Sequence, residues 1–221
     1  MSKALLLIGS PRGKNTSRVL GEALLHGLTA RGWRSETLLL PGLLEAQEGR
    51  ARLLGEFLGA DLTILAAPVY ADSPPAPVMR ALEFLAEEPG LKAKARRFAA
   101  VFNCGFPEPG HTSICLDVCR LFAREAGVGW AGGLGIGGGG AINGTRLADR
   151  GNMTRNLRRA LEMAADDLAR ECDISPEAQT LASKPIVPGW LYLLLAESGW
   201  WLEALKRRTL FKLGDTPFRK P

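Results

Sequence analysis

The chain has 221 residues, of which 46% are hydrophobic and 23% are charged, a globular composition that excludes a disordered chain and a membrane bundle. Its 26 glycines and 14 prolines follow no fixed period, which excludes collagen-like and repeat proteins. The net charge of +5 lies entirely in residues 206–221, so the rest of the chain is formally neutral and we expect no nucleic-acid partner.

Short apolar runs alternate with segments in which apolar residues recur three or four positions apart. This pattern predicts a parallel sheet covered by helices on both faces. We expect strands at residues 4–8, 36–40, 62–66, 98–102 and 130–136. We expect helices around residues 20–28, 44–58, 78–85, 114–121 and 157–168. In such a three-layer α/β sandwich, ligands bind beyond the carboxyl ends of the strands, at the topological switch point.

Two of these helices carry specific expectations. Gly55 weakens the second helix. In the fourth helix, Ile114, Val118 and Leu121 have the spacing of a face that packs on the sheet.

The first strand is followed by the loop GSPRGKNTS, residues 9–17, and then by an amphipathic helix. Glycine allows close approach of the backbone, and the helix start offers unpaired N–H groups, so we interpret this loop as a phosphate-binding site. Its polar side chains are those of Ser10, Arg12, Lys14, Asn15, Thr16 and Ser17. The alternative is an ordinary turn with an Asn or Thr cap. The spacing of Gly9 and Gly13 does not match a nucleotide-triphosphate P-loop.

Two further loops follow the third and fourth strands. In APVYADSPPAP, which begins at Ala67, Tyr70 leaves the strand before prolines that set up the next helix. In NCGFPEPGH, residues 103–111, backbone amides near Gly105 lie beside Phe106. A planar ring held between these two loops, with its phosphate in the first loop, would account for all three.

The motifs GSPRGKNTS, APVYADSPPAP and NCGFPE resemble the flavodoxin-fold, FMN-binding NAD(P)H oxidoreductases, over residues 1–170. The resemblance is strongest to the branch of NADPH-dependent FMN reductases and iron–sulfur flavoproteins. It implies a flavodoxin-like three-layer sandwich whose five-stranded parallel sheet has the order 2-1-3-4-5. It also implies FMN as cofactor and NADPH or NADH as co-substrate.

By the same resemblance, three groups of residues would bind FMN. The phosphate contacts are expected from Ser10, Arg12, Asn15, Thr16 and Ser17. The isoalloxazine contacts are expected from Pro68, Val69, Tyr70 and Ala71. The contacts on the pyrimidine side of the ring are expected from Asn103, Cys104, Gly105 and Phe106.

The implied activity is hydride transfer from NAD(P)H to flavin, followed by electron transfer to a small acceptor such as a quinone or free flavin. The cofactors supply this chemistry, so no catalytic acid–base residues are required. A flavodoxin-like electron carrier without nicotinamide turnover is the alternative, although carriers of this fold are strongly acidic. His111 would either touch the flavin or steady the following helix, and we favour the second role; His26 is expected to be structural or on the surface.

The glycine-rich stretch 132–144 contains Gly135, Gly137 and Gly140 in the spacing of a dinucleotide-binding motif. We interpret this match as chance, because further glycines delay the next helix. The stretch either shapes the nicotinamide pocket or is a flexible loop that needs positive φ angles.

The four cysteines lack the closely spaced pattern of an iron–sulfur cluster. Cys115 and Cys119 would share one helix face, but two ligands do not complete a zinc site, so we expect half-buried free thiols and no metal. The apolar run 4–8 is too short for a signal peptide, and we expect a cytoplasmic protein with reduced thiols.

Residues 171–221 are interpreted as a C-terminal extension. Trp190, Trp200 and Trp201 precede a basic tail, and Glu197 and Glu203 interrupt the apolar stretch, so we expect no transmembrane helix. We favour packing on the sheet domain or on a second subunit of a homodimer. Contact with an anionic membrane surface is the alternative.

Overall fold

The computed structural model describes residues 1–12, 15–88, 91, 95–212 and 214–215. The chain forms two compact units, Met1–Ile186 and Val187–Pro221. The first unit contains the sheet and the three loops that the sequence analysis singled out.

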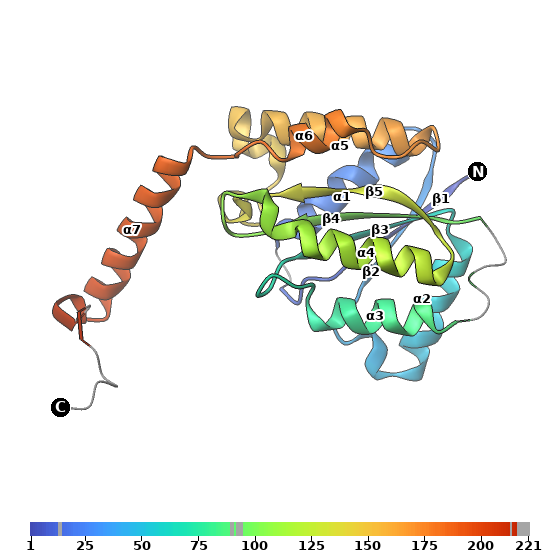
Figure 1. Ribbon diagram of the computed structural model, residues 1–221, viewed down its shortest axis with the longest axis horizontal. Coiled ribbons are helices and arrows are strands. Elements are labelled where there is room, and N and C mark those ends of the chain that lie inside the picture. Colours follow the sequence, from blue (N-terminus) through green and yellow to red (C-terminus); the bar gives the residue numbers. More distant parts are fainter. Residues whose placement is uncertain (13–14, 89–90, 92–94, 213, 216–221) are drawn as a thin grey trace. The chain divides into compact units, whose positions relative to one another are not determined.

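Five parallel strands form the centre of the first unit (Figure 1). They are β1 (Lys3–Ile8), β2 (Arg34–Leu39), β3 (Leu62–Pro68), β4 (Arg97–Asn103) and β5 (Gly129–Ile136). Their order is β2-β1-β3-β4-β5, which confirms the predicted topology. The strands lie where the apolar runs predicted them, with bounds that differ by at most two residues.

Helices cover both faces of the sheet, because successive strand residues point to opposite sides. Leu6 and Ile8 belong to a core shared with α1 (Thr16–Thr29) and α5 (Arg155–Ala169). Leu5 and Leu7 belong to a second core shared with α2 (Gln47–Gly59), α3 (Ala76–Ala86) and α4 (Ser113–Ala126). In Figure 1, α1 and α5 accordingly lie on one side of the sheet and α2, α3 and α4 on the other. This arrangement is the predicted three-layer sandwich.

The expected packing face of α4 was wrong for two of its three residues, since only Val118 packs against the core. Ile114 and Leu121 are 54% and 47% exposed, whereas Cys115, Cys119 and Phe122 are buried against the sheet. The helix is rotated by one residue relative to the expectation because its two cysteines pack as small apolar side chains. Both thiols are therefore fully buried rather than half-buried.

The second helical segment is also more complex than expected. A short 3-10 helix at Leu43–Glu45 comes first, and α2 begins at Gln47 after Ala46, whose φ of −108° and ψ of 151° are extended. Gly55 lies inside α2 without ending it. By contrast, the proline-rich segment before α3 behaves as predicted, with Pro75 at the N-cap.

The first unit extends beyond residue 170, where the sequence analysis placed the start of the extension. Helix α6 (Pro176–Ala182) buries Ala178 and Ala182 in the core that contains α5. The amide of Ile174 donates to the carbonyl of Ala131 in β5 over 2.8 Å. Residues up to Ile186 therefore belong to the compact unit.

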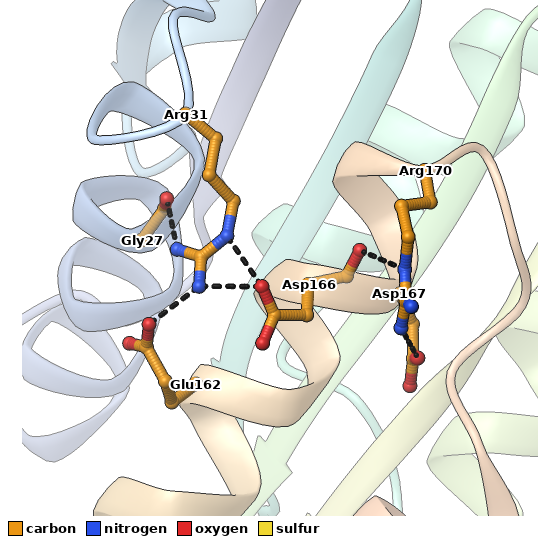
Figure 2. A network of polar contacts seen from close by, with 6 residues as sticks. All are labelled: Gly27, Arg31, Glu162, Asp166, Asp167 and Arg170. Carbon is orange, nitrogen blue, oxygen red and sulfur yellow. Dashed lines mark hydrogen bonds and ion pairs between the residues drawn. The ribbon is translucent and has the colours of Figure 1, made fainter.

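A polar network joins α1 to α5 at the surface (Figure 2). Arg31 follows α1, and its guanidinium donates to the carbonyl of Gly27, to Asp166 over 2.7 Å and to Glu162 over 2.5 Å. Two helices distant in sequence are thus tied by one side chain. One turn away, the guanidinium of Arg170 donates within its own helix end, to the carbonyl of Asp166 and the carboxylate of Asp167.

The second unit consists of α7 (Gly189–Lys206) and a short 3-10 helix at Leu210–Lys212. The chain turns back after α7, and the amide of Thr209 donates to the carbonyl of Ala204 over 2.8 Å. None of the described helices combines the length and apolarity needed to cross a bilayer.

Candidate functional site

The strand register brings the three singled-out loops to one edge of the sheet. Ile8 pairs with Ala66, Pro68 pairs with Asn103, and Asn103 pairs with Ile136, so these strands end side by side. The chain crosses from β2 over β1 to β3, which makes the space above β1 and β3 the topological switch point. The loops after β1, β3 and β4 therefore face a common space.

A cavity of about 260 Å³ lies at this edge. Its lining residues are Ser10, Arg12, Asn15, Thr16, Ser17, Pro68, Val69, Tyr70, Asn103, Cys104, Gly105, Gly139, Gly140, Asn143 and Gly144. Eleven of the thirteen predicted site residues are among them, and the structure brings these eleven together from three separate loops. Ala71 and Phe106 are not in the lining.

The first loop ends in a capped helix start. The side chain of Asn15 accepts a hydrogen bond from the amide of Arg18 over 2.7 Å, so the residue is the N-cap of α1. The amides of Thr16 and Ser17 occupy the first turn, where a helix has no carbonyl partners of its own. These amides and the positive end of the helix dipole make the cavity floor favourable for an anion.

The hydroxyl groups of this helix start have other partners. The Thr16 hydroxyl donates to the carbonyl of Gly139 over 2.9 Å, and the Ser17 hydroxyl donates to Oδ1 of Asn103 over 2.7 Å. Both residues are buried. In this structure their hydroxyl protons therefore join the loops to one another.

Arg12 lies in the cavity lining and is exposed. Its own amide donates to the hydroxyl oxygen of Ser10 over 3.4 Å. Lys14, the second predicted cation, lies outside the described residues. Arg12 is thus the cationic side chain that the described part of the lining contributes.

The loop after β3 begins with a tight turn. Tyr70 and Ser73 exchange two backbone hydrogen bonds of 2.9 and 3.1 Å, and the two residues between them have positive φ angles, 48° at Ala71 and 58° at Asp72. Non-glycine residues rarely adopt this conformation, so the turn is held by its surroundings. The turn leaves Tyr70, which is 44% exposed, at the cavity and places Ala71 outside the lining.

The loop after β4 is anchored by Cys104. Its amide donates to Ile136 over 3.0 Å, and its thiol contacts the carbonyls of Phe106 and Glu108 at 3.3 Å each. Burial raises the pKa of the Cys104 thiol, although the neighbouring backbone dipoles oppose this shift. At neutral pH the residue is accordingly a protonated thiol in the cavity wall.

Phe106 and His111 form a small exposed cluster beside this loop. Phe106 is 58% exposed, and its ring centroid lies 5.0 Å from that of His111. Nδ1 of His111 lies 3.2 Å from a carboxylate oxygen of Asp72. The contact joins the loops after β3 and β4, a role that the sequence did not suggest, since we expected His111 to steady the following helix. His26 is exposed on α1.

Two glycines of the lining leave open space. A Cβ atom added to Gly105 or to Gly140 would meet no atom within 4 Å, and neither residue has a positive φ angle. Nothing in the surrounding protein therefore requires glycine at these positions. A flat ligand that packs on the bare backbone would require it.

The glycine-rich stretch after β5 supplies the part of the lining that sequence reasoning did not assign. Gly139, Gly140, Asn143 and Gly144 line the cavity together with the predicted residues. Gly139 fits closely there, because an added Cβ would lie 2.7 Å from Nδ2 of Asn103. The stretch contains a short 3-10 helix at Gly139–Ala141, and the next α-helix begins only at Arg155, so the G-x-G-x-x-G match opens no α-helix, as predicted.

A larger hollow of about 690 Å³ lies elsewhere, between α3 and the segment that follows β2. Its lining mixes the cations Arg50 and Arg80 with Glu45, Glu83 and Glu87. None of the predicted site residues lies in it, and its carboxylates would repel an anionic ligand. The smaller cavity at the switch point is the better candidate.

Comparison with solved structures shows which fold this is. An apo NADH:FMN oxidoreductase aligns with a TM-score of 0.61 and 18% identity, over 85% of this chain and 97% of that chain. The NAD(P)H:quinone oxidoreductase from Methanothermobacter marburgensis aligns with a TM-score of 0.55 and 18% identity, over 76% and 96%. The flavodoxin of Streptococcus pneumoniae TIGR4 aligns with a TM-score of 0.52 and 17% identity, over 77% and 99%.

These similarities establish the flavodoxin-like fold. No model of a protein family matches the sequence. No curated protein matches it either.

Proposed function

We propose that the cavity at the switch point binds FMN and that the protein transfers hydride from NADH or NADPH to this flavin and then electrons to a small acceptor. The observation that carries the proposal is the convergence of a helix start, a cation and two bare glycine backbones on one cavity. Proteins with this fold include an NADH:FMN oxidoreductase and an NAD(P)H:quinone oxidoreductase, which supports the reaction class.

The phosphate would be held mainly by backbone groups. The first-turn amides of α1 at Thr16 and Ser17 are available, while the hydroxyl protons of both residues are used within the protein. Arg12 would add a charge-assisted hydrogen bond, a contact worth roughly 1.5–3 kcal/mol. The side chain of Asn15 would act indirectly, because it caps the helix that presents the amides.

The ring system would lie between the loops after β3 and β4. Pro68, Val69 and Tyr70 line one part of the cavity, and Asn103, Cys104 and Gly105 line another. The open side of Gly105 admits close contact with a planar ring. Ala71 and Phe106 are left out of this proposal as contacts, because neither lies in the lining.

When bound, FMN would supply the redox chemistry by accepting a hydride equivalent and passing its electrons on. The protein would contribute position and surroundings. The strained turn at residues 70–73 would fix the loop beside the ring, and the contact of His111 with Asp72 would hold that loop against its neighbour. Because Cys104 is protonated at neutral pH, no anionic thiolate would face the electron-rich reduced flavin.

The direct test is spectroscopic. The purified protein, titrated with FMN, should develop a perturbed flavin spectrum, and anaerobic NADH or NADPH should then bleach it. Failure to bind FMN would refute the proposal. Binding without bleaching by either nicotinamide would instead establish the electron carrier, which is the second candidate because the fold also includes a flavodoxin.

Arg12→Ala tests the phosphate site. The variant should fold normally, because Arg12 is exposed, and should bind FMN about 10- to 100-fold more weakly. The control is Arg120→Ala on α4, which removes another exposed cation that does not line the cavity. Equal FMN affinities for wild type and Arg12→Ala, measured by fluorescence quenching, would contradict the assignment of the phosphate to this loop.

Gly105→Ala tests the ring site separately. The added methyl group meets no protein atom, so the free energy of unfolding should change by less than about 0.5 kcal/mol. The methyl group would nevertheless occupy space needed by the ring, and riboflavin affinity should fall together with FMN affinity. Gly110→Ala is the control, because its Cβ is equally free and Gly110 is not in the lining. Unchanged riboflavin and FMN affinities would place the ring elsewhere.

A further inference from the structure

Helix α7 exposes an unusual amount of apolar surface. In the described part of its unit, Val187 and Ala204 are the buried hydrophobic residues. Trp190 is 69% exposed, and Trp200 and Trp201 are 73% and 55% exposed. Exposed apolar patches of this kind mark surfaces that bind a partner.

Apolar residues occur around most of α7, and six of them lie together on one side of the helix. At 100° per residue, the side chains of one group fall within an arc of about 120°. This arc comprises Trp190, Leu191, Leu194, Trp201, Leu202 and Leu205. Glu203 lies roughly opposite and pairs with Arg207 over 2.7 Å. Next to one edge of the arc lies Glu197, and past it lie Leu193 and Trp200. The apolar side of the helix is therefore broad.

A cluster of cations follows directly. Lys206, Arg208 and Lys212 have no carboxylate within ion-pair distance among the residues that the structure describes. Phe211, between them in sequence, is 97% exposed. The sequence adds Arg219 and Lys220 further on, which brings the formal charge of residues 206–221 to +5.

We propose that α7 and the basic segment after it form a surface that binds an anionic lipid bilayer, with the helix lying in the plane of the interface. Trp190 lies in the first turn of α7 and Trp200 and Trp201 lie in its second half, and tryptophan favours the boundary between headgroups and acyl chains. The cations would contact anionic headgroups, and Glu203 on the opposite side would remain in water.

The charge distribution favours a bilayer over a second copy of this chain. In a parallel pair of α7 helices, the two basic segments would lie beside one another and repel. In an antiparallel pair, each basic segment would need acidic residues near the start of the partner helix, but residues 187–192 contain none. An anionic membrane supplies the missing charge, and this inference does not depend on flavin binding.

The test is sedimentation of the full-length protein with vesicles of phosphatidylcholine, alone or mixed with phosphatidylglycerol. The protein should sediment with the mixed vesicles and remain in solution with phosphatidylcholine alone. Because screening weakens attraction to a charged surface, added salt should reduce the bound fraction. Tryptophan emission should shift to shorter wavelength on binding, as the indole rings leave water.

Two variants separate the contributions. Lys206→Gln/Arg208→Gln/Lys212→Gln should weaken binding to the mixed vesicles by about a hundredfold, since three cations leave the surface. Its control is Arg120→Gln/Arg124→Gln/Arg170→Gln, which removes three exposed cations from the first unit. Trp201→Ser/Leu205→Ser should weaken binding as well, and it should abolish the shift in tryptophan emission. Its control is Ile114→Ser/Leu121→Ser, which alters exposed apolar residues of α4.

Several results would overturn the proposal. These are no sedimentation with mixed vesicles, equal sedimentation with both vesicle types, and a triple charge variant that binds as wild type does. A different set of results would assign α7 to a second copy of the chain. Wild type would then self-associate in light scattering and fail to sediment with vesicles, and Trp201→Ser/Leu205→Ser would form smaller particles than wild type. FMN binding by the same variants, measured in parallel, would report on the cavity and stay unchanged under either outcome.

Discussion

Leu6 in β1 and Leu194 in α7 are the same residue type in regular secondary structure, yet Leu6 is fully buried and Leu194 is 59% exposed. The difference comes from the layers around them. Leu6 lies between neighbouring strands and under α1 and α5, whereas the unit of α7 contains one α-helix and one short 3-10 helix among its described residues. An apolar sequence is stabilising only where a second layer can cover it.

The two units therefore use apolar residues for different ends. In the first unit they provide the free energy that holds the cavity loops in place, since burial removes apolar surface from water. In the second unit the same residue types are left to interact with something outside the unit. Three substitutions can break or sharpen this comparison.

The largest expected effect is that of Phe98→Ala. Phe98 is fully buried in β4, and its ring centroid lies 5.0 Å from that of Phe122 and 6.2 Å from that of Trp130. Removing the ring leaves a cavity and should lower the free energy of unfolding by about 3–5 kcal/mol. Trp200→Ala in α7 is the control and should change it by less than about 0.5 kcal/mol. Urea unfolding followed by circular dichroism measures both; similar losses would mean that α7 contributes to the same core.

The elements that could be predicted from the sequence are those whose apolar side chains are buried in the sandwich. Strands buried on both faces leave uninterrupted apolar runs, which identified β1, β3 and β4. The edge strand β2 is largely exposed, and its signal was the shorter apolar run that ends at Leu40. The face of α4 was mispredicted because Cys115 and Cys119 were assessed as metal ligands and thiols, although unpaired cysteine is among the most buried residue types. Counting them as apolar would have given the observed face, with Phe122 and Ala126 in register.

The cavity was predictable only in outline. Parallel strands place their following loops at one edge, so the three loops could be brought together from their order in the sequence. The hydrogen-bond partners of Thr16 and Ser17 could not be predicted. Gly139 is 123 residues from Thr16 and Asn103 is 86 residues from Ser17, and a hydrogen bond over such a separation depends on the complete fold. The wall made by Gly139, Gly140, Asn143 and Gly144 had a signal, the dense glycines after β5 at the same edge of the sheet, but the sequence did not separate a pocket wall from a flexible loop.

The second prediction concerns the two thiols buried under α4. Burial raises the pKa of Cys115 to about 12, with a smaller contribution from Asp72, and raises the pKa of Cys119 well above its ordinary value. A folded-state pKa above the unfolded one adds stability below the unfolded pKa, and this stability is lost as the pH rises toward the folded pKa. The native protein should therefore become less stable from about pH 9 upward.

The comparison of wild type with Cys115→Ala/Cys119→Ala isolates this effect from other alkaline titrations. The variant loses buried atoms and should be the less stable protein at pH 7.5, but the difference in unfolding free energy between the two proteins should narrow by roughly 3–4 kcal/mol by pH 10. Thiol labelling can check that Cys115 and Cys119 are buried in the folded protein. Cys172, which is exposed and present in both proteins, serves as its internal reference. If the difference in unfolding free energy between the two proteins stays constant with pH, the two thiols ionise as readily in the folded protein as in the unfolded chain. Their surroundings would then be more hydrated than the fold indicates.

The smallest expected effect is that of Arg31→Ala, at the surface of the first unit. Arg31 joins α1 to α5 through Gly27, Glu162 and Asp166 (Figure 2), but both carboxylates are half exposed or more, so solvent weakens the pairs. We expect a loss of about 1 kcal/mol that shrinks as salt is added. Arg170→Ala, which removes a pair internal to one helix end, should cost a few tenths of a kcal/mol at most. If the two substitutions cost the same in urea unfolding, the tie between the helices adds nothing to a sandwich already held by its buried layers.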